Sequence, residues 1–241
     1  MYKFDTHVHT AESSICSKVM AKDMVNLYLD AGFSGVCITD HYCKGGYTGF
    51  DRWDGSWPEK VNRFLEGYRI AAEYGSSLGL TVLPGAELRF SGFPSDFLLF
   101  GLTEQFLYDY PELYDYVLED FRALAKQHDI LVFQAHPFRG EKGNAADPRY
   151  LDGVEVLNGH NGHNSRNDLA AEFAKENSLL ACAGSDFHHL GGHGTTGLLT
   201  STRIQSMDTL RKVLGEQNFS IIQPLAGAGC VSDTSPKGAP L

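Results

Sequence analysis

Short apolar runs alternate with amphipathic stretches along most of the chain. Most of the apolar runs are continuous rather than alternating, as is typical of strands buried on both faces of a parallel sheet. The predicted strands cover Lys3–Val8, Gly35–Thr39, Leu80–Leu88, Phe97–Leu102, Ile130–Ala135, Val154–Leu157, Leu179–Ala183 and Thr196–Thr200.

The stretches between these runs have helical periodicity. From Tyr114 to Lys126, apolar residues recur at every third or fourth position and form one stripe that can face a core. The predicted helices cover Lys22–Ala31, Pro58–Leu78, Pro111–Gln127, Ser165–Glu176 and Met207–Gly215. Strands and helices in alternation predict βα units around a parallel sheet or barrel, an α/β fold.

Two segments do not fit this alternation. Residues 42–57 are rich in glycine and aromatic residues and are too long for a tight connection, which predicts a lid or a substrate-contacting loop. Residues 224–241 are small, polar and rich in proline and glycine, which predicts a loosely docked tail. With no internal repeat or linker visible, residues 1–223 are expected to form a single domain.

Composition narrows the class of protein. Hydrophobic residues make up 42% of the 241 positions and charged residues 21%, close to ordinary globular values. No apolar run approaches the length of a membrane span, and the first residues carry no secretory signal, so we expect a soluble cytoplasmic protein without a membrane partner. A net charge of −10 makes nucleic acid an unexpected partner, because such binding relies on lysine and arginine. Oligomeric state cannot be read from the sequence.

The five cysteines are an odd number and form no CxxC pair, so free thiols in a reducing compartment are expected. Cys37 and Cys182 lie in apolar runs and are predicted core residues. Cys16 and Cys43 lie near the motif positions described next, from which they could reach a site.

Histidine and acidic residues gather where the predicted strands end. The carboxyl ends of successive parallel strands meet at one mouth of a barrel, which is where barrel active sites lie. Side chains two apart on a strand share a face, so the H-x-H of the first strand and the D-x-H of a late one can each present two ligands to a cation. Chance placement of metal-type ligands at so many apolar strand ends is improbable. The predicted metal ligands are His7, His9, His41, Glu87, His136, Asp186 and His188.

The ordered motifs D-T-H-V-H-T, T-D-H, G-A-E, A-H-P and S-D-F-H resemble those of the PHP (polymerase and histidinol phosphatase) family over roughly residues 1–200. The resemblance implies a distorted (β/α)7 TIM-like barrel with its metal site at the C-terminal strand ends. It also implies two or three divalent metal ions, typically Zn, Mn or Fe, and hydrolysis of phosphoesters.

By the same resemblance, His7, His9, Glu87 and Asp186 bind one metal. Glu87 bridges to a second metal that also takes His136, and His41 with His188 binds a third. The chain departs from the family pattern at two points. After the H-x-H, where relatives have another histidine or aspartate, it has the segment Glu12, Ser13, Ser14, Ile15 and Cys16; between G-A-E and A-H-P a histidine is missing, and Asp96 is the nearest substitute.

Clustered divalent metals lower the pKa of a shared water from about 15.7 toward about 7, so a metal-bound hydroxide is the expected nucleophile. Glu87 and Asp186 are then catalytic through the metals, and Arg139 in H-P-F-R can clamp a phosphate, although a plain surface arginine is an equal alternative. Substrate binding or leaving-group protonation is assigned to residues at the end of the Val154 strand, namely Asn158, His160 and His163.

The sequence therefore favours a metal-dependent phosphoesterase that acts on a small phosphorylated substrate, as a histidinol-phosphatase-like or nucleotide phosphatase does. One alternative is an amidohydrolase-like enzyme that cleaves C–N bonds, although no lysine occupies a strand end where it could bridge metals. The other is a metal-binding regulatory module without catalysis. The sequence does not name the substrate.

Overall fold

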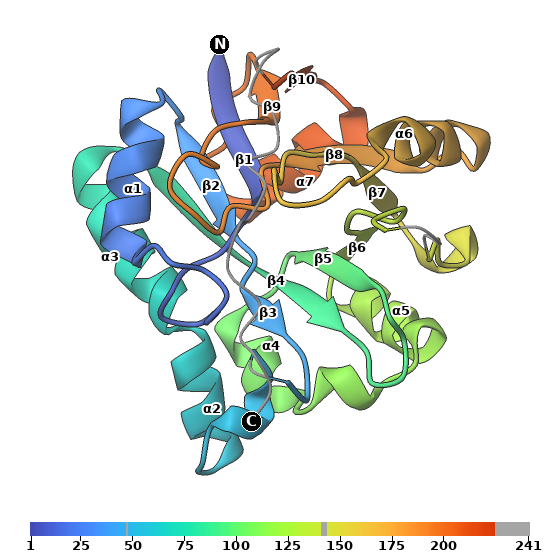
Figure 1. Cartoon of the computed structure of the whole chain (residues 1–241). Coiled ribbons are helices and arrows are strands. Elements are labelled where there is room, and N and C mark those ends of the chain that lie inside the picture. The colour runs from blue at the N-terminus through green and yellow to red at the C-terminus, as the bar shows by residue number, and fades with distance from the viewer. Residues whose placement is uncertain (47, 141–143, 225–241) are drawn as a thin grey trace, which may run out of the picture.

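The computed structural model describes residues 1–46, 48–140 and 144–224, and in these ranges the chain folds as a distorted, nearly closed barrel of TIM type (Figure 1). Beyond the end of β8, Val8 and Phe187 form a parallel bridge that brings the last barrel strand back to the first. The predicted tail lies almost entirely outside the described residues. The barrel strands, in spatial order, are β1 (Tyr2–Val8), β2 (Gly35–Ile38), β4 (Thr81–Arg89), β5 (Asp96–Phe100), β6 (Leu131–Gln134), β7 (Gly153–Asn158) and β8 (Leu180–Gly184).

The sheet is not uniformly parallel, and here the expectation from the sequence was wrong. β5 is antiparallel to both β4 and β6, and β9 (Gly197–Thr200) is antiparallel to β1. The link from β4 to β5 spans only residues 90–95, too short for the crossover that a parallel neighbour requires. Two short strands were not predicted: β3 (His41–Tyr42) pairs with β4, and β10 (Ser220–Ile222) pairs with β9.

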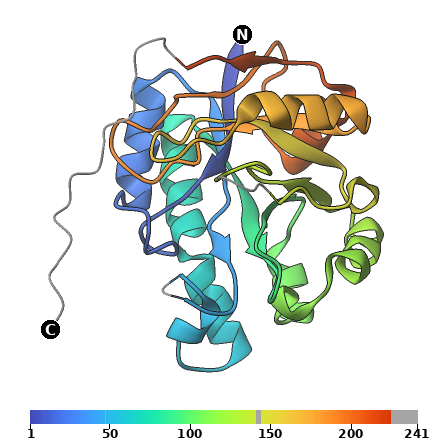
Figure 2. The same cartoon turned by 45° about the vertical axis from the view of Figure 1, so that its right-hand side comes forward.

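Helices cover the outside of the barrel (Figures 1 and 2). The helix α3 packs on α1 and β4, α5 on β6, α6 on β7 and α7 on β8. None of the helices in the described ranges is both long and apolar enough to cross a membrane. Their bounds are α1 (Ala21–Asp30), α3 (Glu66–Leu78), α5 (Leu118–Gln127), α6 (Asn167–Glu176) and α7 (Met207–Glu216).

Two predicted helices are shorter than expected. The predicted helix Pro58–Leu78 is divided at Leu65 into α2 (Trp57–Phe64) and α3. In place of one helix over Pro111–Gln127, a 3-10 turn at Leu113–Asp115 precedes α5, and the short α4 (Glu104–Asp109) lies before it. Glu112 has φ 54°, which a helix cannot accommodate.

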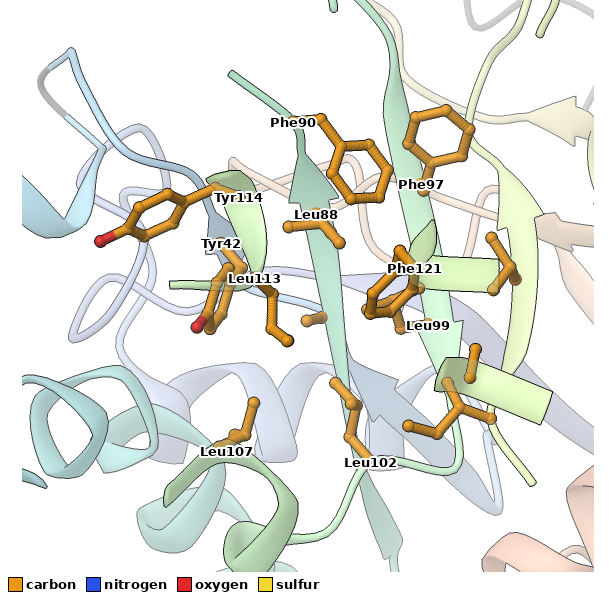
Figure 3. Packing of buried hydrophobic residues seen from close by; sticks show 14 of the residues in the cluster. Tyr42, Leu88, Phe90, Phe97, Leu99, Leu102, Leu107, Leu113, Tyr114 and Phe121 are labelled. Carbon is orange, nitrogen blue, oxygen red and sulfur yellow. The ribbon is translucent and has the colours of Figure 1, made fainter. Parts of the chain in front are cut away.

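An aromatic core packs against the outer face of β4 and β5. Side chains of β4 and β5 such as Leu88 and Phe97 pack with Phe121 of α5 and with Tyr114 of the 3-10 turn (Figure 3). Burial of Tyr114 in this core is the tertiary reason that the segment does not continue as a helix. Because side chains alternate along a strand, burying Leu88 outside turns its neighbour Glu87 toward the mouth of the barrel.

Candidate metal centre

The predicted metal ligands converge at one mouth of the barrel. Their nitrogen and oxygen atoms form groups in which every atom lies within 4.8 Å of the others. These groups are His7, Glu87 and His136; His7, His9 and Asp186; and His9, His41 and His188.

Glu87 and Asp186 lie between the imidazoles. His7 Nε2 is 3.6 Å from Glu87 Oε1 and 3.4 Å from Asp186 Oδ1. His136 Nε2 is 3.0 Å from the same Glu87 oxygen, so this carboxylate joins the two sides of the cluster. His7 Nε2 and His9 Nε2 are 3.1 Å apart, which places two ring nitrogens toward one point as the H-x-H spacing predicts.

The cluster fits a bound cation. Glu87 Oε2 is buried and makes no hydrogen bond with any described residue, although His41 Nδ1 lies 2.8 Å away and His9 Nε2 3.4 Å away. A buried carboxylate oxygen without a hydrogen bond is energetically unfavourable unless something else binds it. Mixed imidazole and carboxylate donors suit Zn, Mn or Fe.

The protonation states of the two carboxylates and of His9 suit metal binding, whereas burial is outweighed by the neighbouring carboxylates, which raise the pKa of His7, His41 and His188, so that a cation would displace protons from these three rings. Burial raises the pKa of Glu87, but the charges of His41 and His7 outweigh it and hold that pKa well below its usual value. Burial likewise raises the pKa of Asp186, and His7 outweighs it. Burial, reinforced by His188 and His41, lowers the pKa of His9 well below its usual value. Ionised carboxylates and a neutral imidazole are the forms that bind a metal.

Glu155, which the sequence analysis missed, holds two of the ligands in place. It is fully buried on β7, and its Oε1 accepts a hydrogen bond from His7 Nδ1 at 2.8 Å. Its Oε2 accepts from the backbone N–H of His136 at 3.0 Å and from Asn158 Nδ2 at 2.9 Å. With the proton of His7 on Nδ1, its Nε2 lone pair is free to face the cluster. A single charged residue inside the apolar run V-E-V was the available signal.

A cavity of about 510 Å³ opens above the ligands. Its wall contains glycines and Thr48 from the predicted lid segment, whereas Tyr42 and Phe50 of that segment are buried in the aromatic core. Beside the acidic Glu87, Asp96 and Asp186, three cationic side chains among the described residues border the cavity. They are Lys18, Arg89 and Arg139.

Asp96, the suggested substitute ligand, is bound by two of these arginines. Arg89 donates to its two oxygens at 2.6 and 2.7 Å, and Arg139 Nη2 donates to Oδ2 at 3.1 Å. The nearest imidazole nitrogen, His136 Nε2, is 3.9 Å from Oδ2. Asp96 therefore anchors two half-exposed guanidinium groups beside the metal ligands. The role of Arg89 was not predicted.

The predicted substrate residues lie at different depths. Asn158 is buried, and its amide nitrogen donates to Asp186 Oδ2 at 3.2 Å as well as to Glu155, behind the ligands. His160 and His163 line the cavity with their rings stacked 4.4 Å apart. Burial lowers the pKa of His160 to about 4. His163 Nε2 is 3.6 Å from Asp186 Oδ2 and makes no hydrogen bond with a described residue.

The barrel is similar to several solved structures. A two-domain protein from Bacteroides vulgatus that contains a predicted PHP-like metal-dependent phosphoesterase matches at 18% identity and a TM-score of 0.68, over 92% of this chain. This chain spans 65% of that protein. PsfC from Pseudomonas syringae matches at 16% identity and a TM-score of 0.64, over 93% of this chain and 92% of its own.

An amidohydrolase from Chromobacterium violaceum, with bound sulfate and no metal, matches at 16% identity and a TM-score of 0.53, over 78% of this chain and 88% of its own. No protein-family model and no curated protein matches the sequence. At these identities the likeness establishes the fold alone, a distorted TIM-like barrel. What the chain does has to be argued from its own site.

Proposed function

We propose that the chain is a metal-dependent phosphoesterase that hydrolyses small phosphomonoesters. The observation that carries the proposal is the convergence of imidazoles and ionised carboxylates at the floor of a cavity that arginine side chains border. Two or three divalent cations of the Zn, Mn or Fe type fit this donor set. When bound, they supply Lewis acidity and a deprotonated water as nucleophile.

The residues divide the work by position. Glu87 and Asp186 would hold the cations as ionised carboxylates, together with the imidazoles of His7, His9 and His136. Arg139 is half-exposed at the cavity wall, so its guanidinium can bind phosphate oxygens while Asp96 keeps it in place.

Leaving-group protonation is assigned to the stacked pair His160 and His163 on the cavity wall. His163 is the better candidate, because its Nε2 has no hydrogen-bond partner among the described residues and lies near Asp186. A proton on that nitrogen can pass to the departing alkoxide. Asn158 orients Asp186 and Glu155 from behind the cavity.

The second candidate function is C–N bond hydrolysis, favoured by the structural similarity to an amidohydrolase. The two arginine side chains that border the cavity, Arg89 and Arg139, favour the phosphoesterase. A guanidinium group binds phosphate oxygens, whereas a neutral amide substrate does not require one. A non-catalytic metal-binding module would have little use for an open cavity over its ligands.

The test is phosphate release from a panel of phosphomonoesters and nucleotides, with metal-stripped protein reloaded separately with Zn, Mn and Fe. We expect activity that returns with metal, is absent from the His7→Ala, His9→Ala double variant and is unchanged in Glu172→Gln, an exposed change on α6. Metal binding without ester cleavage, but with cleavage of an amide panel run in parallel, would refute the phosphoesterase in favour of the amidohydrolase.

A further inference from the structure

A second cavity adjoins the one above the metal ligands. It has a volume of about 390 Å³ and shares three lining residues, Cys43, Gly45 and Arg89, with the first cavity. One wall belongs to the predicted lid segment, and the other is formed by residues 90–94 in the link between β4 and β5. A molecule bound at the metal ligands can therefore extend past Arg89 into the second cavity.

Arg89 lies at the border of the two cavities because of its place on β4. Side chains alternate along a strand, so Arg89 lies on the same face as Glu87 and about 7 Å further toward the C-terminal end of β4. The register of the sheet pairs Arg89 with Asp96 of β5, whose carboxylate is buried. Arg89 donates to this carboxylate through Nε and Nη2, at 2.6 and 2.7 Å. Such a two-point contact fixes the plane of the guanidinium group.

The third nitrogen of this guanidinium group is available. Arg89 Nη1 makes no hydrogen bond with any described residue, and 44% of the Arg89 side chain is exposed. Asp96 also accepts a hydrogen bond from Arg139, so one carboxylate faces two guanidinium groups and one positive charge is left over among the three. Neutralising Asp96 therefore does not by itself account for Arg89.

The other cation of the second cavity already has a partner. Lys44 Nζ lies 2.8 Å from Asp115 Oδ2 and 3.1 Å from Oδ1, and Ser91 donates to the same carboxylate at 2.9 Å. Asp115 does not line the cavity, and neither does any other acidic side chain of the described residues. Much of the remaining wall is apolar, from Phe93 and Pro94. The described lining thus offers Arg89 to an anion and no carboxylate that would repel one.

We propose that Arg89 Nη1 binds a second anionic group, a phosphate or a carboxylate, on the leaving-group side of the substrate, and that the second cavity holds this part of the molecule. Arg139 lies nearer the metal ligands, since its Nη1 is 3.4 Å from His136 Nε2, and it is left for the phosphate that is hydrolysed. The substrate class is then an ester with two anionic groups rather than the phosphomonoester of a neutral alcohol. The proposal rests on the proposed function for the nature of the first group.

The first test compares alkyl phosphates that differ only at the far end of the chain. Chains of two to six carbons end in a methyl group, a carboxylate or a second phosphate, and kcat/KM is measured for each with the metal-loaded protein. We expect the best anionic ester to exceed the methyl-ended ester of the same length about tenfold or more, because a hydrogen bond between two charged groups is strong. The carboxylate and phosphate series show which anion the site prefers.

Variants assign the preference to one side chain. Arg89→Gln should abolish it, and Arg89→Lys, which keeps the charge, should retain part of it. The matched control is Lys44→Gln in the same cavity, which should keep the whole preference because Lys44 is paired with Asp115. The preference is a ratio of two substrates on one protein, so a general loss of activity or of folded protein cancels.

A second test requires no turnover. Alkyl phosphonates with the same end groups cannot be hydrolysed, and calorimetry gives their Kd for the metal-loaded wild type and each variant. We expect the anionic end to lower Kd about tenfold in the wild type and in Lys44→Gln, and to have no such effect in Arg89→Gln.

The outcomes separate this proposal from the proposed function. Ester hydrolysis without preference for an anionic end at any chain length, or with a preference that survives Arg89→Gln, overturns the second anion site and leaves the phosphoesterase standing. Phosphonate affinity that rises with an anionic end and depends on Arg89, with no hydrolysis of any ester, supports the site and overturns the phosphoesterase. Equal phosphonate affinities together with no hydrolysis overturn both.

Discussion

Replacing Glu155 with glutamine tests whether Glu155, which lies behind His7, determines which ring nitrogen of His7 carries the proton. Glu155→Gln keeps the size of the side chain but exchanges one acceptor oxygen for an NH₂ donor. In the wild type, Glu155 Oε2 accepts two hydrogen bonds and Oε1 accepts one. An NH₂ group cannot accept, so the glutamine loses fewer hydrogen bonds when its NH₂ takes the place of Oε1 and faces His7 Nδ1. His7 must then accept at Nδ1 and carry its proton on Nε2.

This change of tautomer affects metal binding more than folding. A protonated Nε2 cannot bind a cation, and second-layer substitutions of this kind lower metal affinity by about 10- to 100-fold, or roughly 1.4–2.7 kcal/mol. The metal-free fold loses less, because the new N–H of His7 can donate to Asp186 Oδ1, now 3.4 Å away. We expect the metal-free variant to lose only about 1 kcal/mol of unfolding free energy.

Two measurements check the reasoning. Competition with a chromophoric chelator gives the metal affinity, and urea unfolding of the metal-free protein gives the stability. Glu172→Gln serves as the control and should change neither quantity. Metal affinity equal to the wild type in Glu155→Gln would show that Glu155 does not set the His7 tautomer.

Three further predictions follow from the same geometry. Arg139→Ala should lower kcat/KM for a phosphomonoester tenfold or more while the metal content stays constant, because a hydrogen bond to a charged group contributes about 1.5–3 kcal/mol. The control Arg149→Ala, at an exposed arginine, should leave the kinetics unchanged. Equal kinetics in the two variants would show that Arg139 does not bind the phosphate. Metal removal by a chelator should lower Tm by roughly 5–10 °C in calorimetry, since metal at 100 times Kd stabilises the fold by about 2.7 kcal/mol, and an unchanged Tm would argue against a bound metal. Gly184→Ala would place Cβ 2.3 Å from His7 Cβ and lower the unfolding free energy measured in urea by about 1–3 kcal/mol. Gly215→Ala should be neutral or stabilising, because a Cβ there meets no described atom within 4 Å beyond its chain neighbours and the backbone of its own helix.

The sequence by itself predicted most of the strands and the histidine and acidic side chains that meet at one mouth of the barrel. The strand runs predicted β1, β2 and β4 closely, because burial on both faces leaves a continuous apolar signal. The two-residue period of a strand is equally local, so His7 and His9 could be placed on one side before any contact was known. Cys37 and Cys182 were confirmed as core residues for the same reason.

Only the tertiary structure decided the direction of β5, the divided helices and the neighbours of each ligand. Direction depends on which strands pair and on the length of the link between them, and the apolar pattern of β5 is the same in either direction.

The surroundings of the ligands join residues far apart in the chain. Glu155 contacts His7, and Arg89 and Arg139 bind Asp96, only after the barrel has closed. The period of hydrophobic residues and the position of a residue at a strand end describe one element at a time, so they locate the candidate metal ligands. The residues that contact those ligands, such as Glu155, are determined by the packing of several elements against one another.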